Sequence, residues 1–357
     1  MGRSLFPIIL VCSFFITAFS CSNKASKSRK PVSSITVLPK KSNYVFGEKV
    51  SINVKTKVKN GEIETVKVYY NSQLIKESPE LDFNVDDIEI SRIGKSNITV
   101  EPIKKDGVKN TRTKAISVIS DIVPKTYSYK IVNVYPHSKE YYTQGLEYYD
   151  GFLYEGTGEH GTSGLFKVNL KSAKELKAHR LDDKYFGEGI TILNNKIYQL
   201  TYRAQKGFVY NLSDFAVLDS FQFKGEGWGL TNDGTNLIMS NGTNVLSWLK
   251  PDDFSVVKTV EVADNKELIY QLNELEIING NIFANLYTTE KIVEIEPETG
   301  RVLSEVSFPG IINMYHKPND RIDYMNGIAY DESTERIFIT GKLWPKLFEV
   351  ELIPPAN

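Results

Sequence analysis

Five polar or aromatic residues recur at one position of a repeated motif, and together they could carry out proton-transfer chemistry. The motif opens a strand, and its copies begin 44, 40, 45 and 53 positions apart, at Gln144, Glu188, Trp228, Asn273 and Asn326. A carboxylate beside apolar rings has a raised pKa and exchanges protons near neutrality. The residue type varies at this position, whereas the Gly/Leu-type pair that follows is repeated, with Asn273-Glu274 as the exception. This contrast favours a binding site over a merely solvated rim.

A second set of residues emerges when the strands that follow each motif are aligned. This register places five residues at equivalent positions: Gly158, Tyr202, Gly242, Tyr287 and Lys342. A lysine and an amide can stabilise a developing oxyanion, and aromatic side chains exclude water and shape a small pocket. The alternative for Lys342 is an ordinary surface lysine. The combined set of a carboxylate, an ammonium, amides and aromatic rings suits general acid–base catalysis.

Other chemistries are poorly supported by the composition. The two cysteines, Cys12 and Cys21, rule out a disulfide scaffold or a zinc ribbon, and the four scattered histidines form no metal-binding motif. No Ser–His–Asp or Cys–His set is present, which argues against an acyl-enzyme. A net charge of −1 indicates no nucleic-acid partner.

The two sets of residues can meet only if their strands surround one axis. Residues 126–354 divide into five units of about 46 residues, each with about four strands, which predicts a five-bladed β-propeller. We expect the ring to close through pairing of Tyr129–Val134 with the last blade. The alternative is an array of β-sandwiches. In a propeller the innermost strands would bring both sets to the same end of the central channel.

Residues 33–122 form a separate small β-domain in this interpretation. Six short β-rich runs with turn residues between them and no helical periodicity predict an immunoglobulin-like β-sandwich: Ile35–Leu38, Val50–Lys55, Val66–Tyr70, Leu81–Val85, Ile98–Glu101 and Ala115–Ile119. The chain as a whole is therefore predicted to be all-β. Nothing in this domain looks catalytic, and we interpret it as a spacer or adhesion module.

The amino-terminal segment is typical of bacterial export. Residues 1–20 combine a basic flank with an apolar stretch too short to span a bilayer, and they predict a lipoprotein signal peptide. Cys21 would then be diacylated, and residues 21–32 would form a flexible polar tether. The alternatives are an uncleaved or ordinarily cleaved signal and, for the basic tether, a nucleic-acid-binding arm. We expect a lipid-anchored protein of the cell envelope, on the periplasmic side or at the outer membrane.

From about Tyr127 to Leu352 the sequence resembles the plant-type glutaminyl-peptide cyclotransferases of the glutamine cyclotransferase family. The resemblance is carried by five motifs: Tyr142-Thr143-Gln144-Gly145-Leu146, Phe186-Gly187-Glu188-Gly189, Gly227-Trp228-Gly229-Leu230, Leu272-Asn273-Glu274-Leu275-Glu276, and Asn326-Gly327-Ile328-Ala329 with Thr340-Gly341-Lys342-Leu343-Trp344-Pro345. It implies a five-bladed propeller that converts an amino-terminal glutamine into pyroglutamate with loss of ammonia.

The resemblance also implies roles for individual residues. Glu188 would shuttle protons, and Asn273 and Lys342 would polarise the substrate. A further set would line the substrate pocket: Gln144, Trp228, Tyr202, Tyr287 and Asn326. Plant members carry tryptophan where this chain has Tyr202 and Tyr287, so substrate preference or rate could differ.

The expected partners are peptides or proteins with an amino-terminal glutamine, acted on by a monomer without a catalytic cofactor. The resemblance also implies a structural divalent cation such as calcium, for which no ligands can be identified in the sequence. Two other functions stay open. One is a non-catalytic propeller that binds peptides or glycans at the channel mouth. The other is a metal-dependent propeller hydrolase or lactonase, which would need more channel carboxylates or histidines than Glu188 alone.

Overall fold

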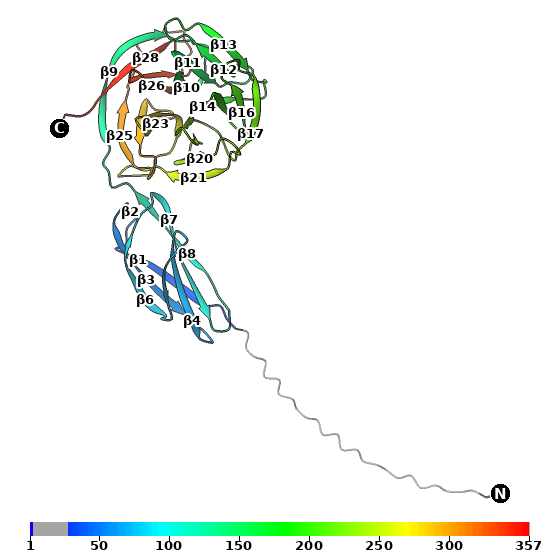
Figure 1. The fold of residues 1–357 in the computed structure, drawn as a ribbon. Helices are drawn as coiled ribbons and strands as arrows, with labels where there is room; N and C mark the ends of the chain where they lie inside the picture. Colours follow the sequence, from blue (N-terminus) through cyan, green and yellow to red (C-terminus); the bar gives the residue numbers. More distant parts are fainter. Residues whose placement is uncertain (3–27, 357) are drawn as a thin grey trace.

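The computed structural model describes residues 1–2 and 28–356, and within these ranges it contains strands and turns but no helix. The predicted cleavage region, Cys21 and most of the predicted tether lie outside the described residues. Accordingly, no helix long and apolar enough to cross a membrane occurs in the described part of the chain. Figure 1 shows two β-domains in succession, and the all-β prediction is confirmed.

The first domain is a sandwich of two sheets. One sheet has three strands in the order β1-β3-β6, and the other has five in the order β2-β8-β7-β4-β5. The strands are β1 (Val32–Leu38), β2 (Asn43–Val45), β3 (Lys49–Lys57), β4 (Ile63–Tyr70), β5 (Gln73–Ser78), β6 (Asp82–Glu89), β7 (Gly94–Lys104) and β8 (Arg112–Ile119). Alternation drives the packing: Val50, Ile52 and Val54 are buried while the residues between them are not. The immunoglobulin-like prediction is confirmed.

The predicted tether is shorter than the sequence suggested, because its last residues are bonded to the sandwich. The Lys104 side chain is almost fully buried, and its ammonium needs acceptors. It donates to Ser28 Oγ, to the Arg29 carbonyl at 3.4 Å and to Asp106 at 3.2 Å. Asn110 Nδ2 also donates to the Pro31 carbonyl, at 2.9 Å. Residues 28–31 therefore belong to the sandwich.

The second domain is a five-bladed propeller. Each of the first three blades is a four-stranded antiparallel sheet. Their strands are β10 (Thr143–Tyr149), β11 (Phe152–Thr157), β12 (Gly164–Val168) and β13 (Glu175–Arg180); β14 (Gly187–Leu193), β15 (Lys196–Thr201), β16 (Lys206–Asn211) and β17 (Val217–Gln222); and β18 (Leu230–Asn232), β19 (Leu237–Met239), β20 (Val245–Leu249) and β21 (Val256–Glu261). The fourth blade contains β22 (Leu272–Ile278), β23 (Asn281–Leu286), β24 (Lys291–Ile295) and β25 (Val302–Ser307).

The fifth blade closes the ring with a strand taken from the start of the domain. It consists of β26 (Met325–Asp331), β27 (Arg336–Gly341), β28 (Lys346–Ile353) and β9 (Lys125–Pro136). β9 pairs antiparallel with β28, with Tyr129 opposite Leu352 and Val134 opposite Phe348, so the predicted closure is confirmed. The first residues of β9 also pair in parallel with β25 of the fourth blade. One strand thus bonds two neighbouring blades.

The inner strands β10, β14, β18, β22 and β26 neighbour one another around the axis. Figure 1 labels β10, β14 and β26 near the centre of the ring. Glycines after the strand-opening residues permit this approach, since a Cβ atom on Gly229 would lie 2.0 Å from the Asn273 carbonyl oxygen. Glu274 replaces glycine in the fourth blade. Its buried carboxylate accepts the backbone N–H groups of Leu146 at 3.1 Å and Ile328 at 2.8 Å. This side chain joins three inner strands across the channel, which explains the exception in the repeat.

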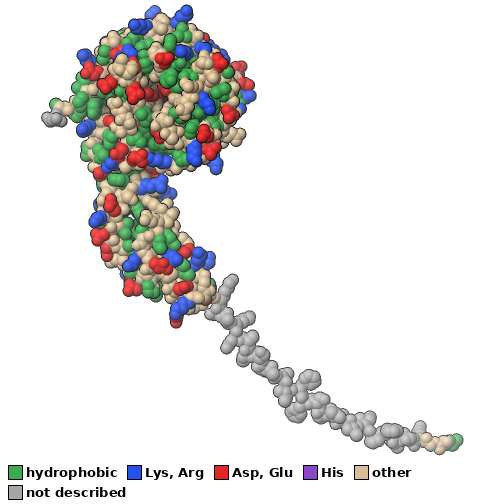
Figure 2. Space-filling view, viewed as in Figure 1, with side chains coloured by type: hydrophobic (Ala, Val, Ile, Leu, Met, Phe, Trp, Pro, Cys, Tyr) green, Lys and Arg blue, Asp and Glu red, His purple; other side chains and the backbone are tan. Residues whose placement is uncertain are grey.

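The sandwich contacts the rim of the propeller. Lys95 N donates to Glu261 at 2.9 Å, and Arg301 pairs with Asp121 at 3.3 Å. On the face shown in Figure 2, acidic and basic side chains are interspersed over both domains. This face therefore presents no large field of a single sign, in agreement with the net charge.

Candidate active site

Irregular pairing directs the strand-opening residues into the channel. The register shifts at this point in four blades: beside Gln144, at Glu188-Gly189, at Asn273-Glu274 and at Asn326-Gly327. A bulge leaves a residue out of the ladder and turns its side chain away from the sheet face. In the sequence, the repeated strand-opening motif marks the position of each of these bulges.

The second set of residues lies where the neighbouring strand leaves the ladder. Tyr202, Tyr287 and Lys342 each follow the last paired residue of β15, β23 and β27. Their backbone N–H groups donate to the carbonyls of Phe186, Gln271 and Tyr324, each two residues before a strand-opening residue, at 2.9–3.0 Å. Both sets therefore lie at the same end of the inner strands.

Seven of the eight predicted site residues line one cavity of about 190 Å³. They are Gln144, Glu188, Tyr202, Trp228, Asn273, Tyr287 and Lys342. Tyr142 and Phe186 complete the lining. The prediction omitted these two, although both stand two residues before a strand-opening residue within the quoted motifs. The cavity is smaller than the pockets of about 300 Å³ or more that take drug-sized ligands, so it suits a single side chain.

Asn326, the eighth predicted residue, lies behind the cavity wall. Its side chain is fully buried, and its Nδ2 donates to the Thr143 carbonyl at 3.0 Å and to Gln144 Oε1 at 3.2 Å. Asn326 is not among the residues that line the cavity. Its contacts orient Gln144, which leaves the Gln144 amide nitrogen to face the cavity.

Aromatic rings form an almost continuous wall. Centroid distances are 6.0 Å from Tyr142 to Phe186, 5.9 Å from Phe186 to Tyr202, 6.5 Å from Tyr202 to Trp228 and 5.4 Å from Trp228 to Tyr287. The Lys342 ammonium bridges the remaining gap, 4.7 Å from the Tyr287 ring and 4.8 Å from the Tyr142 ring. Such contacts stabilise a desolvated ammonium.

Two glycines of the second set make room for this wall. A Cβ atom on Gly158 would lie 2.4 Å from the Phe186 ring, and one on Gly242 would lie 2.6 Å from the Trp228 ring. Gly242 also has a φ of +76°, which a side chain disfavours. The absence of a side chain at these positions is therefore part of the site.

We expect Gly242→Ala to raise KM for the substrate because the new methyl group displaces Trp228. Loss of one aromatic contact of about 0.5–1.5 kcal/mol corresponds to about a two- to tenfold rise. Gly234→Ala is the matched control, since Gly234 has a φ of +82° but no atom within 4 Å of the added Cβ. Steady-state kinetics of both variants test this, and equal KM values would show that Gly242 does not position Trp228.

The carboxyl group and the amine of the cavity are both desolvated. Burial raises the pKa of Glu188 well above its usual range, while the Lys342 charge lowers it and Glu226 raises it. Burial lowers the pKa of Lys342, and Glu188, Asp323 and Glu159 oppose that shift. Each is only 3% exposed, yet within residues 28–356 no ion pair or hydrogen bond joins them. Both groups are thus free to interact with a ligand between them.

Rim residues hold the aromatic wall in place. Trp228 Nε1 donates to Glu226 at 3.1 Å, and Glu226 pairs with Arg203 at 2.8 Å. Tyr142 Oη donates to Asp323 at 3.0 Å. Asp323 lies in the long segment between β25 and β26, which does not follow the repeat, so the repeat pattern did not indicate it.

Asn273 has unused hydrogen-bonding capacity. The residue is 2% exposed, and its Oδ1 has no hydrogen-bond partner among the described residues. An unpaired buried amide oxygen is costly, because it loses its hydrogen bonds to water without replacement. The Asn273 side chain lines the cavity, and no hydrogen bond among the described residues uses its Nδ2, so its N–H can donate to a small polar ligand.

The implied structural cation finds no obvious site. Within the described ranges, no group of three or more His, Cys, Asp or Glu side chains is placed to hold a metal ion. The cation therefore stays a prediction from the resemblance.

Comparisons with known proteins agree with this geometry. The family model described as glutamine cyclotransferase matches residues 107–352, more than half of the chain. The chain belongs to the glutamine cyclotransferase family. The match begins about 20 residues before the start suggested by the motifs, within the last part of the sandwich.

Two members illustrate the relationship. A glutaminyl-peptide cyclotransferase of Arabidopsis thaliana is 35% identical over 235 residues, which cover 65% of this chain and 73% of the relative. The crystal structure of a glutaminyl cyclase from Myxococcus xanthus matches with a TM-score of 0.61 and 32% identity, over 65% of this chain and all of that one. The rest of this chain has no counterpart in that structure.

Proposed function

We propose that this family member is a glutaminyl-peptide cyclotransferase that converts the amino-terminal glutamine of peptides or proteins to pyroglutamate. The observation that carries the proposal is the small aromatic-walled cavity that Glu188 and Lys342 share with the Asn273 side chain. The names of the two relatives support the same activity. The α-amine attacks the side-chain amide carbonyl carbon (Cδ) of the same residue, so positioning supplies much of the acceleration.

In this proposal Glu188 handles the protons. Its carboxylate accepts a proton as the amine nitrogen bonds to the side-chain amide carbonyl carbon (Cδ), and the acid then returns that proton to the departing amide nitrogen. The C–N bond of the side-chain amide breaks, and ammonia leaves. A carboxyl group with a raised pKa is matched to both steps near neutral pH.

Lys342 and Asn273 would stabilise the tetrahedral intermediate. The Lys342 ammonium lies over two rings at the cavity wall and donates to the developing oxyanion. The Asn273 amide N–H can donate a second hydrogen bond to the same oxygen.

Gln144, Trp228, Tyr202 and Tyr287 would hold the glutamine side chain folded toward its own amine. The cavity excludes most water, since its polar side chains are buried and its rings are half-buried. Asn326 acts through Gln144 in this scheme. No metal or cofactor takes part in any step we propose.

Mass spectrometry of peptides tests the proposed function. A short Gln-initiated peptide should lose one ammonia during incubation with the purified chain, whereas the same peptide with an acetylated amino terminus or an amino-terminal asparagine should not. Binding of the Gln-initiated peptide without loss of ammonia would instead identify a non-catalytic binding propeller.

We also propose that Cys21 anchors the protein by lipid to the cell envelope, as its amino-terminal pattern suggests. The sandwich would then act as a spacer between anchor and propeller. Wild type should partition into the detergent phase after expression in a bacterium that processes lipoproteins, and Cys21→Ser should stay in the aqueous phase. Equal partitioning would refute the anchor.

A further inference from the structure

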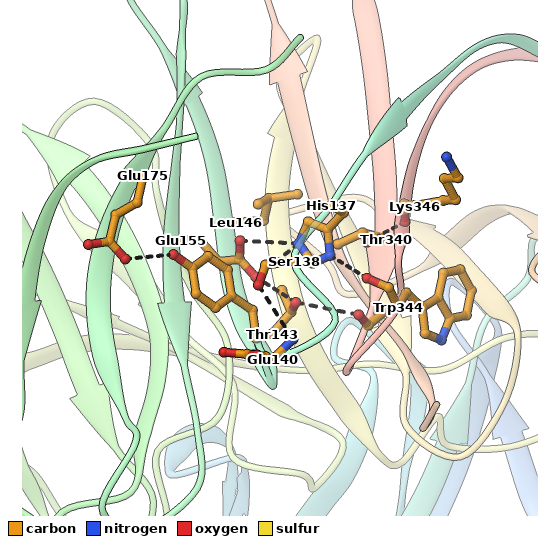
Figure 3. Close-up of polar contacts among 12 residues, drawn as sticks. His137, Ser138, Glu140, Thr143, Leu146, Glu155, Glu175, Thr340, Trp344 and Lys346 are labelled. Carbon is orange, nitrogen blue, oxygen red and sulfur yellow. Dashed lines mark hydrogen bonds and ion pairs between the residues drawn. The ribbon is translucent and has the colours of Figure 1, made fainter. Parts of the chain in front are cut away.

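A buried charged cluster lies directly behind the segment that carries Lys342. It consists of His137, Glu155 and Thr143, and none of these residues lines the cavity. His137 is the first residue after β9, Thr143 opens β10 and Glu155 lies on β11. Figure 3 shows the three side chains converging beside Trp344.

The hydrogen bonds of the cluster place one proton on Nδ1 of His137. Its Nδ1 lies 2.7 Å from the Trp344 carbonyl oxygen, which can only accept, so Nδ1 carries a proton. Its Nε2 lies 3.2 Å from both oxygens of Glu155. When Nε2 is also protonated, the cluster is an imidazolium–carboxylate pair. Thr143 Oγ1 completes it by donating to Glu155 at 2.6 Å.

The same cluster connects the two segments that shape the active site. His137 N donates to the Pro345 carbonyl at 3.0 Å, and Leu343 N donates to the Tyr141 carbonyl at 2.8 Å. Residues 341–345 are thereby clamped against residues 137–143. Lys342 belongs to the first segment, and Gln144 directly follows the second.

We propose that the buried His137–Glu155 pair positions Lys342, so that His137 is a positioning residue of the cyclisation site. This inference rests on the proposed function. In the neutral imidazole Nδ1 keeps its proton for the Trp344 carbonyl, and Nε2 then turns a lone pair toward the Glu155 carboxylate. We call the His137–Glu155 pair, with its bonds to residues 341–345, the clamp. Loss of the Nε2 proton of His137 would make its contact with Glu155 repulsive and would loosen the segment that carries Lys342.

The pH range of the effect follows from the surroundings of His137. Burial lowers its pKa, but the charge and hydrogen bonds of Glu155 and the Trp344 carbonyl outweigh that, and the net shift is upward from 6.5. Tyr141 also packs edge-on against the ring, with the ring centroids 6.2 Å apart, and its hydroxyl donates to Glu175 on β13. Because the folded-state pKa is raised, the clamp is intact below about pH 6.5 and is lost as the pH rises through the pKa of His137.

Glu155→Gln separates charge from hydrogen bonding. The glutamine amide can donate to Nε2 of a neutral His137 and still accept from Thr143, so the chain of hydrogen bonds survives without a charge. We expect this variant to keep most of the wild-type kcat at neutral pH but to lose the His137-dependent fall at alkaline pH. Deprotonation of Lys342 contributes its own alkaline fall, which both proteins share.

His137→Ala should lower kcat by about 10–100-fold with little change in KM, because a misplacement of about 1 Å costs on the order of 10²-fold. His179→Ala is the matched control, since His179 also packs against an aromatic ring but lies on the outer strand β13. Wild-type kcat in His137→Ala, or the same alkaline fall in Glu155→Gln as in wild type, would overturn the proposal.

Two measurements are independent of activity. The C2–H resonance of His137, one of four histidines, should titrate above pH 6.5 in wild type and at lower pH in Glu155→Gln. A crystal structure of His137→Ala should show residues 341–345 displaced. An unshifted titration or an unmoved segment would refute the positioning role, whereas an inactive wild type with both results as expected would refute only the proposed function.

Discussion

Glu188→Gln should reduce the rate of ammonia release from Gln-initiated peptides by about 10²–10⁴-fold, the range attributed to a positioned general acid–base group. Glutamine has the same shape but cannot accept the amine proton or deliver one to the leaving nitrogen. The loss should appear in kcat, since the neutral amide keeps the cavity filled. Stopped assays of ammonia over a range of pH values provide the measurement.

Glu276→Gln is the matched control for this variant. Glu276 is also a buried carboxyl on an inner strand, and burial raises its pKa well above the usual range. It lines a different hollow, however, at the opposite end of the inner strands. We expect near-wild-type rates from this control. A Glu188→Gln protein that folds normally and releases ammonia at the wild-type rate would remove Glu188 from the mechanism.

Lys342→Met should lower kcat by about 10²–10³-fold, because an oxyanion donor of this kind contributes about 2.7–4 kcal/mol. Methionine preserves much of the alkyl packing against Tyr142 and Tyr287. The variant should also change the pH dependence: the Lys342 charge lowers the pKa of Glu188, so its removal raises that pKa further. The residual kcat of Lys342→Met should rise as Glu188 loses its proton, and this rise should occur at a higher pH than in the wild type.

Lys342→Arg tests whether charge alone is sufficient. The guanidinium retains the charge, but its planar fork does not fit a small site between two rings as an ammonium does. We expect partial recovery at most. An unchanged kcat in Lys342→Met, or an unshifted pH profile in its residual activity, would contradict the assigned role.

The repeat pattern was sufficient to predict the ring and most of its contents. Spacing alone indicated which residues open the inner strands, and the register of the next strand indicated Tyr202, Tyr287 and Lys342. These predictions succeed because a propeller repeats its backbone geometry in every blade, so equivalent positions in sequence are equivalent in space. The strand-opening residue varies in type while the pair that follows it is repeated, and this contrast indicates the binding site.

Other features depend on contacts that no local pattern encodes. Asn326 has the position and type of a lining residue, but its amide is held by Thr143 and Gln144. The His137–Glu155 pair joins residues of two blades only after the ring closes. Strand β5 was missed because it is an edge strand with mostly exposed side chains and no clean alternation. Glu274 departs from the repeated glycine, and only its bonds to the backbone N–H groups of Leu146 and Ile328 explain why.

A crystal structure of the Glu188→Gln protein with a Gln-initiated peptide tests the central claim most directly, since the substrate should accumulate unreacted. We expect the glutamine side chain inside the cavity, with its γ-carbonyl oxygen within hydrogen-bond distance of Lys342 Nζ and its α-amine facing residue 188. A peptide bound with its glutamine side chain outside the cavity, or with the carbonyl turned away from Lys342, would contradict the account.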